Sequence, residues 1–323
     1  MSHEPGASRT PPVRRARSLS RADVQAQVRA RKQQFDEANE KITARSGRNL
    51  VSAIAIGVGM AALMVVSLVV IKEIYMVLVA VMVAFGTLEL ASALKHAGIR
   101  VPRIPTVAAG VVVVPAAYYW GATGQWLVAL GGILFVALWR VVDAAVQKPR
   151  PTPSALLRDV AAGTFVQVYV AFLASISVLL LANDGGQWWV LAFIVVVVLV
   201  DVGAYASGLN FGKHPMAPTI SPKKTWEGLA GAVIAALIGG VLLAIFMLGQ
   251  PWWFGLVFGA VIALTATVGD LSESLLKRDI GIKDMSSWLP GHGGILDRLD
   301  SMLPSAAAAY VLWFVFASGA GAQ

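Results

Sequence analysis

The feature that most constrains this sequence is a series of apolar runs too long for buried strands or ordinary core helices. The hydrocarbon of a bilayer offers no water to backbone amides, so each run is expected to satisfy its own hydrogen bonds as a helix. The period-two alternation typical of transmembrane β-barrels is absent. A composition of 57% hydrophobic and 14% charged residues agrees with this pattern. The chain is therefore predicted to be an all-α, polytopic integral membrane protein.

Nine segments are predicted to span the membrane, at residues 50–71, 74–94, 104–122, 126–143, 160–182, 188–208, 227–249, 252–268 and 303–319. The loops at 95–103, 144–159, 209–226 and 269–302 then share one side with the N-terminus. Of the 26 Lys and Arg residues, 11 lie in residues 1–48 and 14 lie in or beside these loops. Only Lys72 falls on the other side, so the positive-inside rule makes the N-terminus and these loops cytoplasmic.

The charge pattern also bears on partners. Topology and attraction to anionic membrane lipid account for the net charge of +8, so no nucleic-acid partner is expected. The chain has no cysteine, which excludes disulfides, thiolate metal sites and a cysteine nucleophile.

Three regions are predicted along the chain. Residues 1–48 form a polar, basic cytoplasmic extension, in which apolar residues at helical spacing indicate an amphipathic helix at about 20–45. That helix is expected either to lie on anionic lipid or to form a coiled coil or partner contact. Residues 49–159 form the N-terminal transmembrane helices, and residues 160–323 form a second transmembrane region that holds the candidate chemistry in its loops 209–226 and 269–302.

A few ionisable residues interrupt the apolar spans, where charge is costly and often functional. Glu89 is expected either to pair with a neighbouring helix or to sit at the interface beside Lys95. Arg140 and Asp143, three residues apart, can pair locally. Asp201 closes the run VLAFIVVVVLVD and is predicted to face a cavity or an interhelical partner.

The segment SLLKRDIGIKDMSSWLPGHGGILDRLD, residues 274–300, gathers acidic and basic residues in an otherwise apolar chain. On a helix, Asp270, Ser274 and Lys277 would share one face, and so would Asp297 and Asp300. Two carboxylate pairs brought together would suit Mg²⁺, which prefers oxygen ligands and usually keeps substrate phosphates in its shell. The alternative for each aspartate alone is a structural or solvated carboxylate, and the joint spacing argues against it.

A second basic segment runs from Phe211 to Gly228. Ser221 and Pro222 suit the N-cap and first position of the seventh span. This would place Lys223 and Lys224 in its first turn, where free amides and two ammonium groups would bind phosphate. The alternative is that the lysines only anchor the span at the membrane interface.

Several of these residues, read in order, resemble the signature of the phosphatidate cytidylyltransferases, which are also called CDP-diacylglycerol synthases. They are Ser274, Lys277-Arg278, Lys283-Asp284, Pro290, His292-Gly293-Gly294, Asp297-Arg298 and Asp300. The blocks DVGAYASG and FGKHPMAPTISPKKTWEG resemble other parts shared by that family. The resemblance covers residues 160–310 by motif and 50–160 by helical layout, and Leu209 departs from the family pattern.

The resemblance implies transfer of a cytidylyl group from CTP to phosphatidate, with CDP-diacylglycerol and pyrophosphate as products. It implies Mg²⁺, a second, monovalent cation such as K⁺, a homodimer, and a bacterial inner membrane with the site on the cytoplasmic side. The implied metal ligands are Asp270 and Asp297, with Asp300 and Asp201 as further ligands or neighbours, and the implied catalytic residues are Asp270, Asp297 and Lys277. The implied substrate-binding residues are Ser221, Lys223, Lys224, Ser274, Arg278, Lys283, His292, Gly293, Gly294 and Arg298.

Two rival functions remain open from the residues. A CTP-dependent polyprenol kinase, or a cytidylyltransferase for another lipid phosphate, would also join a lipid acceptor to a cytosolic nucleotide. An ion-coupled transporter would use Asp201, Glu89 and Asp270 as coupling carboxylates. The transporter predicts internal repeats and a carboxylate at mid-membrane, whereas no convincing repeat is found and the acidic cluster lies near the cytoplasmic edge.

Overall fold

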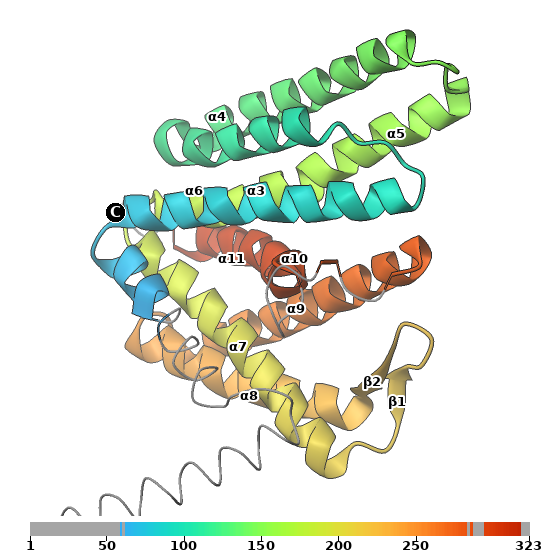
Figure 1. Cartoon of the computed structure of the whole chain (residues 1–323). Coiled ribbons are helices and arrows are strands. Elements are labelled where there is room, and N and C mark those ends of the chain that lie inside the picture. Colours follow the sequence, from blue (N-terminus) through green and yellow to red (C-terminus); the bar gives the residue numbers. More distant parts are fainter. Residues whose placement is uncertain (1–58, 60–61, 283–284, 287–293, 318–323) are drawn as a thin grey trace, which may run out of the picture. The chain divides into compact units, whose positions relative to one another are not determined.

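The computed structural model describes residues 59, 62–282, 285–286 and 294–317, nearly all within one compact unit, Ala61–Gln323. The predicted amphipathic helix at about 20–45 and half of the predicted span 50–71 lie outside the described residues. The elements, shown in Figure 1, are α3 (Lys72–His96), α4 (Arg103–Val146), α5 (Pro153–Val166), the π-helix η1 (Gln167–Phe172), α6 (Leu173–Leu181), α7 (Gly186–Phe211), β1 (Pro215–Ala217), β2 (Ser221–Thr225), α8 (Trp226–Phe246), α9 (Trp252–Ile280), α10 (Leu296–Leu299) and α11 (Met302–Phe316).

Among the described residues, seven helical segments are long and apolar enough to cross a membrane. The prediction of a mostly helical protein with several such spans is confirmed, whereas the count of nine is not. The predicted spans 104–122 and 126–143 both lie in α4, whose 44 residues would extend about 66 Å as one straight helix, twice the hydrocarbon thickness. Gly121 interrupts the helical backbone with φ 63°, and Figure 1 shows the two parts of α4 folded back on one another.

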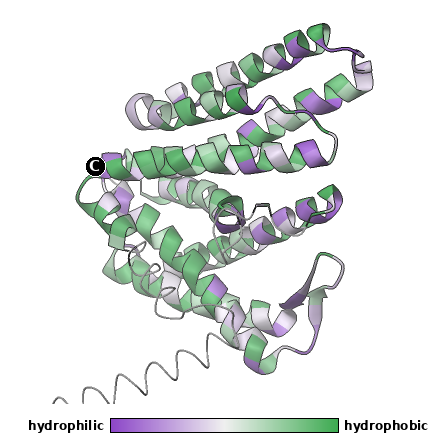
Figure 2. Ribbon diagram, viewed as in Figure 1, coloured by the Kyte–Doolittle hydropathy of each residue, from purple (hydrophilic) through white to green (hydrophobic). Residues whose placement is uncertain are grey.

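The described parts of the four loops predicted to share one side lie at the same end of the helices. Figure 1 shows the α3–α4 and α4–α5 connections, the β1–β2 hairpin and the C-terminal end of α9 at that end. Figure 2 shows hydrophilic residues concentrated there, whereas the long helices are mostly hydrophobic away from that end. Large apolar side chains such as Leu134 and Leu138 on α4 are exposed in the structure, as expected for a surface that faces lipid tails.

The β1–β2 hairpin corrects two predictions. The fold is not purely helical, because Ser221–Thr225 forms a strand that pairs antiparallel with Pro215–Ala217. Ser221 is therefore not an N-cap, and Lys223 and Lys224 lie on β2 and not in the first turn of a helix. The cap is Thr225, whose hydroxyl accepts a hydrogen bond from the Gly228 amide at 3.1 Å at the start of α8.

Replacing Thr225 by alanine is expected to lower the free energy of unfolding by about 1 kcal/mol, because the first turn of α8 loses its side-chain acceptor. Thermal unfolding in detergent measures the change. Thr219→Ala is the matched control, since Thr219 is exposed in the turn between the strands and should change stability by less than about 0.5 kcal/mol. Equal losses in the two variants would contradict the capping role.

Helix α9 continues beyond the predicted end of its span at residue 268 and ends at Ile280, followed by Gly281 in the left-handed region. The segment predicted as a loop from residue 269 is thus helical for its first three turns. Asp270, Ser274 and Lys277 lie on this one helix, so the helical spacing read from the sequence applies.

Helix α8 packs closely against α7 and α9 through small residues. A Cβ atom on Gly203 of α7 would lie 2.7 Å from the carbonyl oxygen of Gly231, and one on Gly255 of α9 would lie 2.7 Å from that of Gly240. Lipid tails are as apolar as the helices, so such close backbone contact is a main source of helix association in a membrane. This packing holds together the three helices that carry the candidate site.

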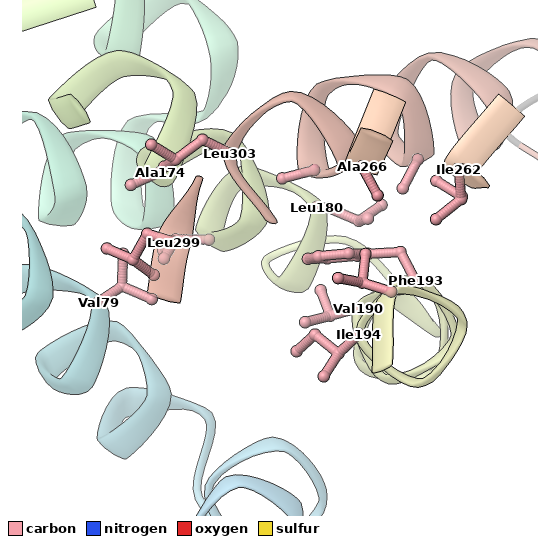
Figure 3. Close-up of a cluster of buried hydrophobic side chains, with 14 of the residues drawn as sticks. Val79, Ala174, Leu180, Val190, Phe193, Ile194, Ile262, Ala266, Leu299 and Leu303 are labelled. Carbon is pink, nitrogen blue, oxygen red and sulfur yellow. The ribbon is translucent and has the colours of Figure 1, made fainter. Parts of the chain in front are cut away.

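A continuous apolar cluster ties α3, α6, α7, α9, α10 and α11 together. In Figure 3, Leu299 of α10 and Val79 of α3 belong to this cluster, as do Leu303 of α11 and Ala174 of α6. The cluster fixes α10, which bears Asp297, against the N-terminal helix α3.

A buried ion pair joins α4 to α5. Arg140 and Asp159 are 1% and 3% exposed, and the guanidinium donates to Asp159 Oδ2 at 3.0 Å from Nε and at 2.6 Å from Nη2. The predicted local pair between Arg140 and Asp143 is present at 3.5 Å, but it is the longer contact. Asp159 also accepts the backbone amide of Arg100 at 3.0 Å, so it fastens the α3–α4 connection too.

Candidate active site

A cavity of about 180 Å³ lies between α7, β2, α8 and α9. Four charged side chains line it, namely Asp201 from α7, Lys223 and Lys224 from β2, and Asp270 from α9, while most of the other lining residues are apolar. We call it the lysine–aspartate pocket. Lys224 forms an ion pair with Asp270, so the hairpin and α9 meet through opposite charges. A pocket with paired cations and carboxylates in apolar walls is suited to a phosphate group and a metal ion.

The acidic side chains of this region converge from separate elements. Asp201 lies close enough to Asp270 and Asp300 for their charges to interact, and the cations Lys224 and Arg298 interact with it as well. Asp201, predicted as a metal ligand or neighbour, therefore lies within electrostatic range of two others of the predicted set.

A second cluster, which we call the Lys277 network, adjoins the pocket on α9. The ammonium of Lys277 contacts Glu273 Oε2 at 3.2 Å and Asp297 Oδ1 at 2.7 Å. The other oxygen of Asp297 accepts the Gly294 amide at 2.7 Å and the Met285 amide at 3.4 Å. Asp297 is thus held by protein donors on both oxygens and in turn fixes Lys277.

Glu273 is a site residue that sequence reasoning missed. Its side chain is buried, its Oε1 receives no hydrogen bond from a donor among the described residues, and the carboxyl of Asp300 lies beside it. Two neighbouring buried carboxyls need a proton or a cation between them. The available signal was its position on α9, three residues after Asp270 and four before Lys277.

These observations test whether the residues fit Mg²⁺. In the described part of the chain, no group of three or more His, Asp or Glu side chains is placed so that it could hold a metal ion by itself. Mg²⁺ commonly takes only one or two carboxylates and completes its shell with substrate phosphates and water. Asp270 lines the pocket, and Glu273 on the same helix has a buried oxygen without a donor among the described residues, so these carboxyls are of the kind that such a partial site uses.

Other predicted site residues lie on α9 and β2 but do not line the pocket. Arg278 donates from Nε to the carbonyl oxygen of Ile220 at 3.3 Å and links α9 to the turn before β2. Ser274 lies 3.5 Å from Asp270 Oδ1, a long contact. Ser221 begins β2, two residues before Lys223. Lys283, His292 and Gly293 lie outside the described residues, so their predicted roles stay predictions.

The sequence left the partner of Glu89 open. Glu89 lies on α3, it is 1% exposed, and it accepts hydrogen bonds from the backbone that leads into α10. The first alternative, pairing with a neighbouring helix, is confirmed, because Leu296 is the first residue of α10. The signal in the sequence was an acidic residue inside an apolar span, but its contacts come from far along the chain.

Comparisons with known proteins identify the family of this chain. The sequence profile of the cytidylyltransferase family matches residues 51–316. A phosphatidate cytidylyltransferase of Mycobacterium bovis is 40% identical over 276 residues, which cover 84% of this chain and 90% of the relative. The enzyme of the same name from Mycobacterium leprae is 39% identical over 281 residues, with 84% and 90% covered. One from Helicobacter pylori is 47% identical over 133 residues, with 41% and 49% covered.

The matched segment includes every described helix from α3 to α11, with the lysine–aspartate pocket and the Lys277 network. On the breadth of that match and on 40% identity over most of both chains, the protein belongs to the cytidylyltransferase family.

Proposed function

We propose that the protein transfers a cytidylyl group from CTP to phosphatidate and releases pyrophosphate, which makes CDP-diacylglycerol for phospholipid synthesis. The observation that carries the proposal is the lysine–aspartate pocket, in which Lys223 and Lys224 face Asp201 and Asp270 at the polar end of membrane helices. A water-soluble nucleotide and a lipid phosphate can meet at such a place. The names of the mycobacterial relatives support the same reaction.

In this reaction a phosphate oxygen of phosphatidate attacks the α-phosphorus of CTP. The bond from that phosphorus to the bridging oxygen breaks, and pyrophosphate leaves with the electron pair. Such a transfer needs alignment of the two phosphates and neutralisation of their charge more than covalent help from the protein. Lys223 and Lys224 supply positive charge to the nucleotide phosphates, and Ser274 and Arg278 follow Asp270 on α9.

Asp270, together with Asp300 and Asp201, would hold Mg²⁺, which would supply positive charge to neutralise the phosphates. Asp270 also pairs with Lys224, so one carboxylate orients a cation of the nucleotide site. Glu273 and Asp297 hold the ammonium of Lys277 in one position. From there its positive charge can interact with a phosphate oxygen. Direct binding of Mg²⁺ by Asp297 stays a prediction, and its observed partners equally suit a role in holding Lys277.

The site is proposed to face the cytoplasm of a bacterial inner membrane, where CTP is available, with a homodimer and a second, monovalent cation such as K⁺ as further expectations. The basic residues of the loops at the polar end support this orientation.

Cysteine labelling tests the orientation, because the native chain has no cysteine. In intact cells a membrane-impermeant maleimide is expected to label Asp184→Cys, between α6 and α7, and not Lys148→Cys, between α4 and α5. Both positions should react after the cells are opened. Labelling of Lys148→Cys alone in intact cells would show the opposite orientation.

The proposed reaction is tested by incubating the purified protein in detergent with CTP, phosphatidate and Mg²⁺. Pyrophosphate and CDP-diacylglycerol are expected, and EDTA should abolish their formation until Mg²⁺ is restored. A polyprenol kinase would release CDP and no pyrophosphate, and a cytidylyltransferase for another lipid phosphate would require that acceptor. Absence of pyrophosphate with phosphatidate would contradict the proposal.

A further inference from the structure

Glu89 on α3 contacts the segment that bears Asp297, although it comes about two hundred residues earlier in the chain. Its Oε1 accepts hydrogen bonds from the Ser286 hydroxyl at 2.5 Å and from the Ile295 amide at 2.9 Å, and its Oε2 accepts the Leu296 amide at 2.8 Å. The residue is 1% exposed. A carboxylate buried to this degree is stable only when its oxygens receive donors, and these three supply them.

The accepted amides belong to the start of a helix. Ile295 precedes α10 and Leu296 is its first residue, so their N–H groups have no acceptor within the helix. A side chain from another helix thus caps this turn, and its negative charge suits a helix N-terminus. The backbone at 295–296 is therefore fixed to α3.

The Glu89 carboxylate also lies close to the backbone of Gly294. A Cβ atom on Gly294 would lie 2.8 Å from Glu89 Oε2 and 3.0 Å from Oε1, so only glycine allows the backbone to approach the carboxylate this closely. The Gly294 amide is one of the donors that hold Asp297, at 2.7 Å from Oδ2. Asp297 Oδ1 in turn contacts Lys277 at 2.7 Å. An unbroken chain of contacts runs from Glu89 through Gly294 and Asp297 to Lys277.

We propose that Glu89 is a positioning residue for the transfer reaction, and that α3 thereby contributes to an active site otherwise built from α7, β2, α8, α9 and α10. Glu89 does not touch substrate. It sets the backbone at 294–296, which orients Asp297 and hence the Lys277 ammonium. Only the expected fall in kcat rests on the proposed function. The expected change in backbone exchange at 294–300 can be measured without substrate.

The geometry requires a carboxylate of this length. Glutamine has the same shape, but it would turn its NH₂ group toward one set of donors and leave either the Ile295 or the Leu296 amide without an acceptor. Aspartate keeps the charge but is one methylene shorter, so it cannot reach both amides from the same backbone. Both Glu89→Gln and Glu89→Asp should therefore release the 294–296 backbone.

Hydrogen–deuterium exchange and kinetics on the full-length protein in detergent test the proposal. Glu89→Gln is expected to raise amide exchange at least tenfold in peptides covering 294–300, with little change in α7 and α8. Its kcat should fall at least tenfold, while KM for CTP and for phosphatidate stays within threefold, because the Lys277 charge acts in the transition state. Glu89→Asp should retain an intermediate activity.

Gln125→Met is the matched control. Gln125 is 1% exposed on α4, and its side chain donates to Ser175 Oγ at 2.7 Å, away from the pocket. This variant should lower the melting temperature but keep kcat per folded molecule within threefold of wild type and leave exchange at 294–300 unchanged. A general loss of stability is thereby separated from a loss of positioning.

Unchanged exchange at 294–300 in Glu89→Gln would overturn the proposal, and so would a kcat within threefold of wild type. If wild type has no transferase activity, the proposed function fails, whereas the exchange result still decides whether Glu89 holds this backbone.

Discussion

Asp297→Asn is expected to lower kcat by about 10²–10³-fold, the range seen when one preorganised charge or donor is removed from an active site. Asparagine can keep its oxygen toward the Gly294 amide, but it removes the negative charge opposite Lys277 and then directs its NH₂ group at the Lys277 ammonium. The ammonium then loses its fixed position. Pyrophosphate release at saturating CTP and phosphatidate gives kcat, and circular dichroism with a thermal scan shows that the variant is folded.

Asp279→Asn is the control for this prediction. Asp279 lies on the same helix as Lys277 and is exposed, so the change alters net charge equally without touching the Lys277 network. It should keep activity within twofold. Full activity in Asp297→Asn would remove Asp297 from the site.

Two roles of Asp297 can be separated by further measurements. If Asp297 acts by orienting Lys277, Lys277→Met should show a similar loss, and the double variant should be little worse than either single one. If Asp297 binds Mg²⁺ directly, the variant should instead require a much higher Mg²⁺ concentration and regain activity there.

Arg140→Met is expected to destabilise the protein by about 3–5 kcal/mol, because it leaves the buried carboxylate of Asp159 without its cation. Asp159 would keep only the Arg100 amide as a donor, and the attachment of α5 to α4 and to the α3–α4 connection would weaken. A thermal scan in detergent should show a loss on the order of 10 °C. The active-site pocket lies on other helices, so activity per folded molecule should persist at low temperature.

Two further variants test whether the loss of stability comes from the buried ion pair. Asp143→Asn removes the exposed, 3.5 Å partner of Arg140 and should cost less than about 1 kcal/mol. The double change Arg140→Met with Asp159→Leu removes both buried charges and should recover much of the stability. An Arg140→Met variant no less stable than Asp143→Asn would mean that the buried pair contributes little.

Helical spacing predicted the part of the site that lies on one helix. Asp270, Ser274 and Lys277 share α9 as expected, because positions four and three apart on a helix are neighbours wherever the helix ends. The end itself was misjudged, since hydropathy marks where a span leaves the hydrocarbon and not where its hydrogen bonding stops. Glu273, on the same helix, was available to the same argument and was overlooked.

The hairpin shows a different limit. Ser221 and Pro222 suit a helix start by local preference, and the structure places them in a strand instead. Both choices satisfy the backbone locally, and pairing with residues 215–217 decides between them. Capping preferences of about 1 kcal/mol are too small to outweigh such pairing.

The amino-acid sequence by itself determined the membrane class, the helical spans and the common side of the polar loops, because hydrocarbon forces each span to bond internally and leaves charge at the ends. Its motif also indicated the chemistry. Only the tertiary structure decided that Asp159 and not Asp143 is the main partner of Arg140, that Lys224 meets Asp270, and that Glu89 caps the turn before Asp297. These contacts join residues from separate elements, and no local periodicity records which helices the packing of small and apolar side chains brings together.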